Sequence, residues 1–169
     1  MKKTVLVFGL LSAVVSILIM AATVPAISAH RYEMSDVLGY SAIVLSALFV
    51  FFGIRSYRQR TGSGRISFGR AVAVGVLISL VSCVLYAAAF EVLYFKVAPD
   101  FGEKFAACMV ERAREKGAGE QQIAETTKKA RTFKELYDNP LTNAMVTFGT
   151  SFPVGLVVTA ISAAILRKR

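Results

Sequence analysis

The sequence is poor in charged residues for its length. Of its 169 residues only 18% are charged and 55% are hydrophobic, whereas a soluble domain has about a quarter of its residues charged. That excess of apolar side chains cannot be buried inside one small globule, because a domain of this size leaves much of its surface in water. The scarcity of charge therefore excludes an ordinary soluble domain.

The sequence also has few residues suited to metal binding or catalysis. It has one histidine, His30, and two cysteines, which are too few for a recognisable zinc site. Cys83 lies inside an apolar run and Cys108 in a charged segment, so no disulfide is expected between them. No nucleophile has an evident base nearby. We expect no catalytic residue, no metal, no cofactor and no cleft in which polar side chains converge.

Four long apolar runs dominate the chain. A helix needs about 20 apolar residues to cross a hydrocarbon layer of about 30 Å, and in lipid the backbone groups must bond within the segment. The sequence therefore predicts an all-α fold, an integral membrane four-helix bundle in one domain over residues 1–169. The spans cover roughly residues 5–24, 37–54, 71–95 and 145–166.

The first run has a competing interpretation as a secretory signal. It follows "MKK" and ends near the small residues of "PAISA", but its apolar part is longer than the 7–15 residues of such a signal. We expect the run to be retained as a span. Cleavage would leave the orientation of the other spans unchanged.

Basic residues mark one face of the predicted bundle. The loop from 51 to 71 has five arginines and no acid, and both chain ends are basic, whereas residues 25–36 are acidic on balance. Short cytoplasmic loops are enriched in Lys and Arg, so both termini are predicted to be cytoplasmic. The arginines are expected to contact anionic lipid rather than nucleic acid. They are Arg55, Arg58, Arg60, Arg65 and Arg70.

The same loop contains "TGSG", which has an alternative interpretation as a phosphate-binding turn. It lacks the Gly-Lys-Ser/Thr ending of a nucleotide-binding loop, and no strand is predicted before it. We therefore favour a flexible turn between helices.

The charged segment from 99 to 140 predicts an extracytoplasmic helical hairpin between the third and fourth spans. Two amphipathic patterns meet at "GAG" (117–119), where Gly117 suits a left-handed helix end, and Asn139-Pro140 ends the second pattern. The hairpin either packs on itself over the bundle or serves as an arm that binds a partner. Its apolar stripes are Phe101, Phe105, Cys108 or Met109 and Ala113, then Ile123, Thr127, Ala130, Phe133 and Tyr137.

Small residues recur at every fourth position in the last two spans. Such rows allow helix backbones to approach closely, so we predict that the third and fourth spans are in contact. Pro153, beside Gly155, predicts a bend in the fourth span. The rows are Ala71, Gly75, Ser79, Cys83 and Ala87, and Thr147, Ser151, Gly155, Thr159 and Ala163.

Glu91 is the one ionisable residue inside an apolar run. It falls about 30 Å beyond residue 71, near the outer interface, where it can reach water or pair with Lys96. The alternative is a role in relaying protons or cations.

With the spans placed, the sequence resembles the domain-of-unknown-function family 4199, whose members are small four-span proteins of bacterial inner membranes. The resemblance covers nearly the whole chain and implies this topology, but it implies no activity. Thr150 stands where many members carry an acidic residue before a Pro-Val-Gly motif, so no acid-dependent role is expected there. The resemblance to the family is carried by "MSDVLGYSAIVLSALFVFFGIRSYR", "GRISFGRAVAVGVLISLVSC", "VAPDFGEKFA", "KELYDNPLTN" and "FPVGLVVTAISAAILRKR".

Two functions fit these features. The first is a non-enzymatic accessory or interaction subunit that contacts a membrane protein through its hairpin and its rows of small residues. The alternative is a small oligomeric transporter or channel-like protein that uses Glu91 and the Pro153 bend. Membrane lipids, and either a membrane-protein partner or further copies of the chain, are the expected partners.

Overall fold

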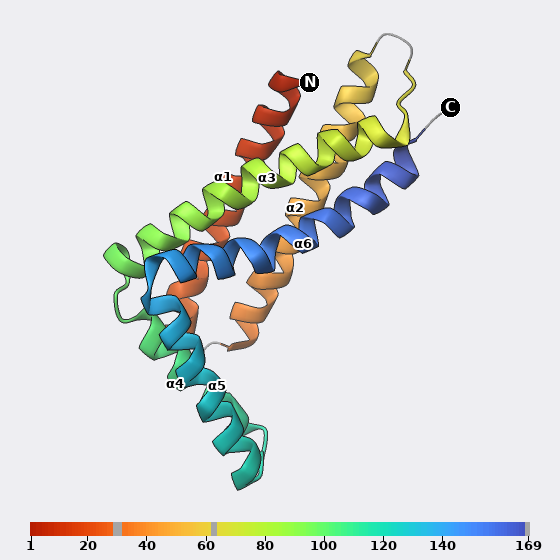
Figure 1. Cartoon of the computed structure of the whole chain (residues 1–169). Helices are drawn as coiled ribbons and strands as arrows, with labels where there is room; N and C mark the ends of the chain where they lie inside the picture. The colour runs from red at the N-terminus through yellow and green to blue at the C-terminus, as the bar shows by residue number, and fades with distance from the viewer. Residues whose placement is uncertain (29–31, 62–63, 168–169) are drawn as a thin grey trace.

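The described part of the chain folds into six α-helices and one short π-helical turn (Figure 1). The computed structural model describes residues 1–28, 32–61 and 64–167. His30 and the centre of the "TGSG" turn lie outside these ranges. The elements are α1 (Lys2–Ser28), α2 (Tyr32–Arg60), α3 (Phe68–Val92), η1 (Leu93–Val97), α4 (Phe101–Glu115), α5 (Glu120–Asp138) and α6 (Pro140–Leu166).

Four of the helices are long and apolar enough to cross a membrane, which confirms the predicted all-α bundle. Each candidate span contains the predicted apolar run and extends beyond it. Much of the apolar surface faces outward: Leu18 is 64% exposed and Ile165 is 66% exposed. Such a surface is stable only against lipid or another protein, so this is a multi-span membrane protein. The spans are Lys2–Pro25, Val37–Arg60, Phe68–Val97 and Pro140–Leu166.

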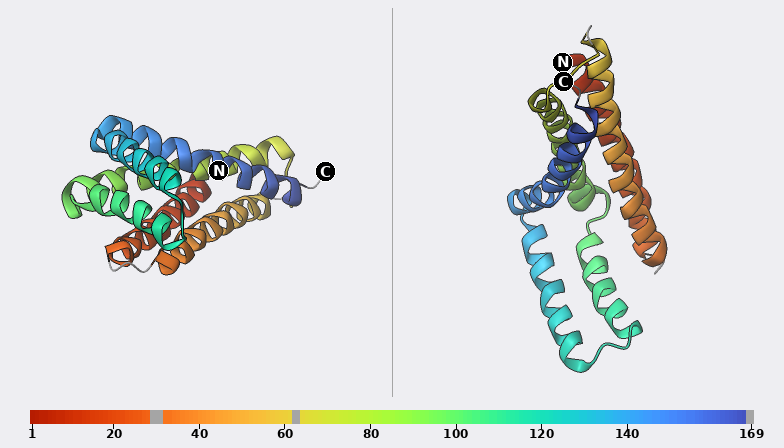
Figure 2. Two further views of the ribbon diagram at one scale, coloured as in Figure 1. Left: turned by 90° about the horizontal axis from the view of Figure 1, so that it is seen from below. Right: turned by 90° about the vertical axis from the view of Figure 1, so that its right-hand side faces the viewer.

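The four spans form two pairs. Helix α1 packs chiefly against α2, and α3 packs chiefly against α6, with α1 also contacting α3. Both chain ends lie at one end of the bundle, called here the terminal end, and α4 and α5 lie at the other, called here the hairpin end (Figure 2). The pairs lie close together at the terminal end and separate toward the hairpin end.

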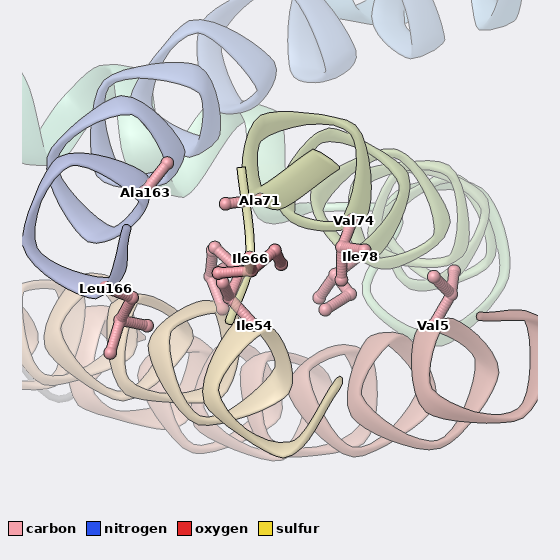
Figure 3. Close-up of a cluster of buried hydrophobic side chains, with 9 residues drawn as sticks. Val5, Ile54, Ile66, Ala71, Val74, Ile78, Ala163 and Leu166 are labelled. Carbon is pink, nitrogen blue, oxygen red and sulfur yellow. The ribbon is translucent and has the colours of Figure 1, made fainter. Parts of the chain in front are cut away.

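A cluster of buried apolar side chains, called here the terminal core, joins all four spans at the terminal end (Figure 3). Its centre is fully enclosed, with Ile54, Val74 and Ile78 all 0% exposed. Its members are Val5, Val50, Ile54, Ile66, Ala71, Val74, Ile78, Ala163 and Leu166. The terminal core therefore holds the two helix pairs together at this end.

Helices α4 and α5 pack side by side as the predicted hairpin and project beyond the ends of α1 and α2 (Figures 1 and 2). Gly117 has φ of 72°, the left-handed conformation expected where α4 ends. A single residue, Asn139, separates α5 from α6, and its side chain accepts a hydrogen bond from the Thr142 amide at 3.3 Å. The predicted apolar stripe of α5 is wrong at one position: Thr127 is exposed, and Thr126 is half-buried in its place. With Thr126 the stripe advances by three and four residues alternately, which follows one face of an α-helix more closely than the predicted spacing.

Candidate functional site

A cavity of about 460 Å³ lies between the helices in the half of the bundle nearest the hairpin. All four spans contribute to its wall, and Phe101 and Phe105 of α4 also line it. The wall is mostly apolar, but hydroxyl and thiol groups converge on it from the four spans. The expectation that no cleft would gather polar side chains is therefore wrong. These residues are Ser16, Thr23, Ser46, Ser79, Ser82, Cys83, Tyr86, Thr150 and Ser151.

The exposed residues of the cavity wall are all on α2 and α6. Ile43 on α2 is 48% exposed and Val154 on α6 is 43% exposed, whereas the lining residues of α1, α3 and α4 are buried or half-buried. The cavity therefore opens sideways between α2 and α6. Toward the terminal end, the tightly packed terminal core closes it.

Three serines from three different spans are joined by hydrogen bonds beside the cavity. The Ser82 hydroxyl donates to Ser12 Oγ at 3.0 Å, and Ser12 Oγ lies 3.2 Å from Ser46 Oγ. Ser12 is 0% exposed, so its hydroxyl would lack a partner without this network. The network links α1, α2 and α3, and it was not predicted from the sequence. Serines inside apolar runs are a signal that partners exist on neighbouring helices, but they do not say which ones.

The predicted contact between the third and fourth spans is confirmed. Gly75 faces Thr159, and Gly155 faces Ser79, whose hydroxyl donates to the Gly155 carbonyl at 3.4 Å. A Cβ at Gly75 would lie 2.5 Å from Thr159 Cγ2, and one at Gly155 would lie 2.9 Å from Ser79 Cβ. Both glycines are therefore needed for α3 and α6 to approach this closely.

A third glycine, Gly9 of α1, has the same role toward α3 and was not predicted. A Cβ there would lie 2.9 Å from Val81 Cβ. Gly9 has a small residue four positions on, Ala13, but Val5 and Ile17 stand at the next positions of that spacing, so no long row of small residues marked it.

Glu91 and Pro153 are not brought together by the fold. Glu91 is half-buried near the end of α3, and its Oε1 is buried with no hydrogen-bond partner among the described residues. Neither Glu91 nor Pro153 is among the described residues that line the cavity, although Thr150, Val154 and Gly155 are. Helix α6 continues through Pro153, and the bend there stays a prediction.

The hairpin is anchored to the spans by aromatic side chains. Phe90 of α3 lies at the centre of this anchor, with its ring centroid 6.0 Å from that of Phe101 in α4 and 5.9 Å from that of Tyr137 in α5. The hydroxyl of Tyr94 in η1 also donates a hydrogen bond to Oδ1 of Asp138 in α5 at 2.8 Å. Contacts from both hairpin helices to the end of α3 fix the position of the hairpin base.

Asp138 is held by two groups. The Lys134 ammonium, 2.7 Å from Asp138 Oδ2, and the Tyr94 hydroxyl lower the pKa of the Asp138 carboxyl, while its partial burial acts in the opposite direction. A carboxyl whose pKa is lowered by folding contributes stability above its ordinary pKa of 3.8, and this contribution is lost as the pH falls through the folded value.

We expect the protein to lose a small part of its stability below about pH 4 because Asp138 becomes protonated. The Asp138 carboxylate contributes less than about 1 kcal/mol to the free energy of unfolding, since its ion pair with Lys134 is largely exposed to water. Unfolding in detergent, followed from pH 3 to pH 6, measures it. Asp138→Asn should flatten this pH dependence relative to the parent protein, whereas Glu135→Gln, an exposed change on the same helix, should not. Equal pH dependence in the parent and Asp138→Asn proteins would show that Asp138 has no part in it.

Among the five predicted lipid-contact arginines, Arg58 has a structural role. Its Nη1 donates a hydrogen bond to the Leu166 carbonyl at 3.1 Å, at the carboxyl end of α6. The last carbonyl groups of a helix have no hydrogen-bond partner within the helix, and Arg58 supplies one. Its positive charge also interacts favourably with the negative end of the α6 helix dipole. Arg55, Arg60, Arg65 and Arg70 are exposed at the terminal end. Arg60 also lines a shallow hollow of about 570 Å³ beside Lys2, Lys3 and Tyr57.

Arg58→Ala should destabilise the bundle by about 1 kcal/mol through the loss of this helix cap. Arg55→Ala removes the same charge from an exposed position on the same helix and should change the stability much less. Denaturant unfolding in detergent compares the two variants. If both lose the same stability, overall charge rather than the cap is responsible.

The two cysteines are buried in different places, Cys83 in α3 and Cys108 in α4, and they are not joined by a disulfide, as predicted. No group of three or more His, Cys, Asp or Glu side chains able to hold a metal occurs within the described ranges.

A family model described as a protein of unknown function (DUF4199) matches residues 6–168, nearly the whole chain. No curated protein and no solved structure matches this chain.

Proposed function

The chain belongs to the DUF4199 family, and we propose that it works as a non-enzymatic accessory subunit that contacts a membrane-protein partner through its α4–α5 hairpin. The proposed location is a bacterial inner membrane with both chain ends in the cytoplasm. The arginines gathered at the terminal end support this orientation. We propose that the exposed side chains of Arg55, Arg60, Arg65 and Arg70 contact anionic lipid.

The observation that carries the proposal is the form of the hairpin. It is fixed at its base by the aromatic anchor and by the Tyr94–Asp138 hydrogen bond, and its tip projects away from the spans (Figure 1). The apolar stripe of the hairpin is already covered within the chain: Ala130 is buried, and Cys108 is buried in a cluster that also contains Met20 of α1. Its outward surface is polar and charged, which suits a partner outside the hydrocarbon layer.

In this proposal the partner does not contact the rows of small residues in α3 and α6. Gly75 and Gly155 are occupied by Thr159 and Ser79 within the same chain, so these surfaces are not available to a second protein. This supports a contact on the hairpin that does not involve the surfaces between α3 and α6.

The alternative, a transporter or channel, has less support. None of the described lining residues of the cavity is charged, Glu91 lies outside the wall, and the terminal core closes the cavity toward the terminal end. An ion path would need polar groups continuing through that closed half. No carboxylate or imidazole is among the described residues that line the wall beside its hydroxyl groups, which supports a non-enzymatic function.

Site-specific photocrosslinking in cells tests the proposed contact. A benzoylphenylalanine at Gln122 or Lys128, both exposed on α5, should give one discrete crosslinked product containing a second protein. The matched control places the same group at Leu18 or Ile165, which are exposed on the spans and should crosslink mainly to lipid. Products that contain only copies of this chain, together with recovery of a stable homo-oligomer in mild detergent, would contradict the accessory function.

A fusion experiment tests the proposed orientation separately. Green fluorescent protein attached after Arg169 should fluoresce, and alkaline phosphatase at the same place should be inactive, because the carboxyl end is cytoplasmic. A phosphatase attached in the hairpin turn at Gly117 should be active. The reverse pattern would overturn the orientation.

A further inference from the structure

We propose that the cavity between the two helix pairs binds a neutral lipid-like amphiphile, with one hydrocarbon chain and an uncharged head that carries hydroxyl or carbonyl groups. The amphiphile enters from the bilayer through the opening between α2 and α6. This site is separate from the hairpin contact, and neither proposal depends on the other.

The wall of the cavity selects for an uncharged molecule. Its described lining residues are apolar, hydroxyl-bearing or thiol-bearing, and no carboxylate, ammonium or guanidinium is among them. A charged head inside such a wall would lose its hydration without gaining a partner of opposite charge, which is strongly unfavourable. The apolar side chains, among them Met20, Val24 and Phe105, provide contact for a hydrocarbon chain.

Three hydroxyl groups on the wall remain available to a ligand. The hydroxyls of Ser16, Tyr86 and Ser151 make no hydrogen bond to any described residue, although they come from three different helices. Other hydroxyls of the wall are already satisfied: Thr23 donates to the Ile19 carbonyl at 2.8 Å, and Thr150 donates to the Val146 carbonyl at 2.9 Å. Each hydroxyl can both donate and accept, so the three suit a neutral head with hydroxyl or carbonyl oxygens.

The entrance faces the part of the membrane where such a molecule resides. The exposed lining residues Ile43 of α2 and Val154 of α6 both lie inside the spans rather than at their ends. The two helices are joined at the terminal end, where Arg58 bonds the Leu166 carbonyl, so the opening lies in the hairpin half. A hydrocarbon chain can therefore enter sideways without crossing a polar surface.

Photolabelling of the full chain in phospholipid nanodiscs tests the proposal. The probe is a monoacylglycerol with a diazirine in its acyl chain, and the comparison probe is an alkyl sulfonate with the same chain and diazirine. The monoacylglycerol should label wall peptides from α1, α3 and α6 at concentrations at which the sulfonate labels only lipid-facing surfaces. Equal labelling of the wall by the two probes, or monoacylglycerol label spread evenly over lipid-facing positions, would overturn the proposal.

Matched variants locate the site. Ala47→Phe fills the cavity and should reduce wall labelling to the level of the sulfonate, whereas Ala160→Phe, an exposed change on α6, should leave it unchanged. Ile43→Trp narrows the entrance at an exposed position, so it tests the same point without crowding the interior. Unchanged wall labelling in Ile43→Trp and in a folded Ala47→Phe protein would show that the probe does not occupy the cavity.

A third variant tests the head-group contact. Tyr86→Phe removes one of the three available hydroxyls and should weaken competition by unlabelled monoacylglycerol roughly two- to tenfold, the effect of one hydrogen bond. It should leave competition by an alkane of the same length unchanged. Equal loss for both competitors would contradict recognition of a polar head.

Discussion

Replacing Gly75 by leucine should lower the free energy of unfolding by about 3 kcal/mol or more, because α3 and α6 have no space for a side chain at that point. A Cβ alone would lie 2.5 Å from Thr159 Cγ2 and 2.9 Å from Thr159 Oγ1. Thr159 is branched at Cβ and places both Cγ2 and Oγ1 against this position, so the larger leucine side chain forces the helices apart. Heating in detergent with a thiol-reactive dye measures the loss, since both cysteines are buried in the folded protein.

Gly149→Leu is the matched control for Gly75→Leu. It introduces the same side chain into α6, where a Cβ would meet no atom within 4 Å. Its unfolding temperature should stay near that of the parent protein. Equal unfolding temperatures for the two leucine variants would show that the close approach of α3 and α6 at Gly75 does not stabilise this pair of helices.

Phe101→Ala should release the hairpin from the spans while the bundle stays folded. Phe101 is 8% exposed, and its ring centroid lies 6.0 Å from that of Phe90 and 5.8 Å from that of Phe105. Truncation of a buried phenylalanine costs about 3–5 kcal/mol, and here the new space would join the existing cavity. Amide hydrogens of α4 and α5 should exchange roughly a hundredfold to a few thousandfold faster, since each 1.4 kcal/mol corresponds to about tenfold.

Hydrogen exchange followed by mass spectrometry makes this measurement for each helix separately. Phe68→Ala is the control, because Phe68 is 46% exposed at the start of α3 and its loss should leave hairpin exchange unchanged. Faster exchange in the spans to the same degree as in the hairpin would show that Phe101 supports the whole fold rather than the hairpin base.

The features that the sequence could predict are those encoded within one segment. Hydropathy alone identifies the spans, because a helix in lipid must be apolar along its whole length. The hairpin follows from charge, from the glycines around residue 117 and from Asn139-Pro140. The contact of α3 with α6 was predictable because small residues mark both partners.

The features that were missed depend on pairing between distant segments. The Ser12–Ser46–Ser82 network, the Arg58 cap on α6 and the Tyr94–Asp138 hydrogen bond each join residues more than thirty positions apart. Which serine faces which depends on how each helix is rotated, and hydropathy does not encode that rotation. The cavity was missed for the same reason, since it exists only because the two helix pairs separate at the hairpin end.

The single-residue junction at Asn139 has a mechanical consequence. Helix α5 is about 28 Å long at 1.5 Å per residue, and it is joined almost without interruption to α6, which forms one wall of the lateral entrance. A load on the tip of α5 therefore acts on α6 through this short junction, and the first lining residue of α6, Thr150, is eleven residues beyond Asn139. A molecule that binds the tip of the hairpin would therefore change the width of the entrance from outside the lipid.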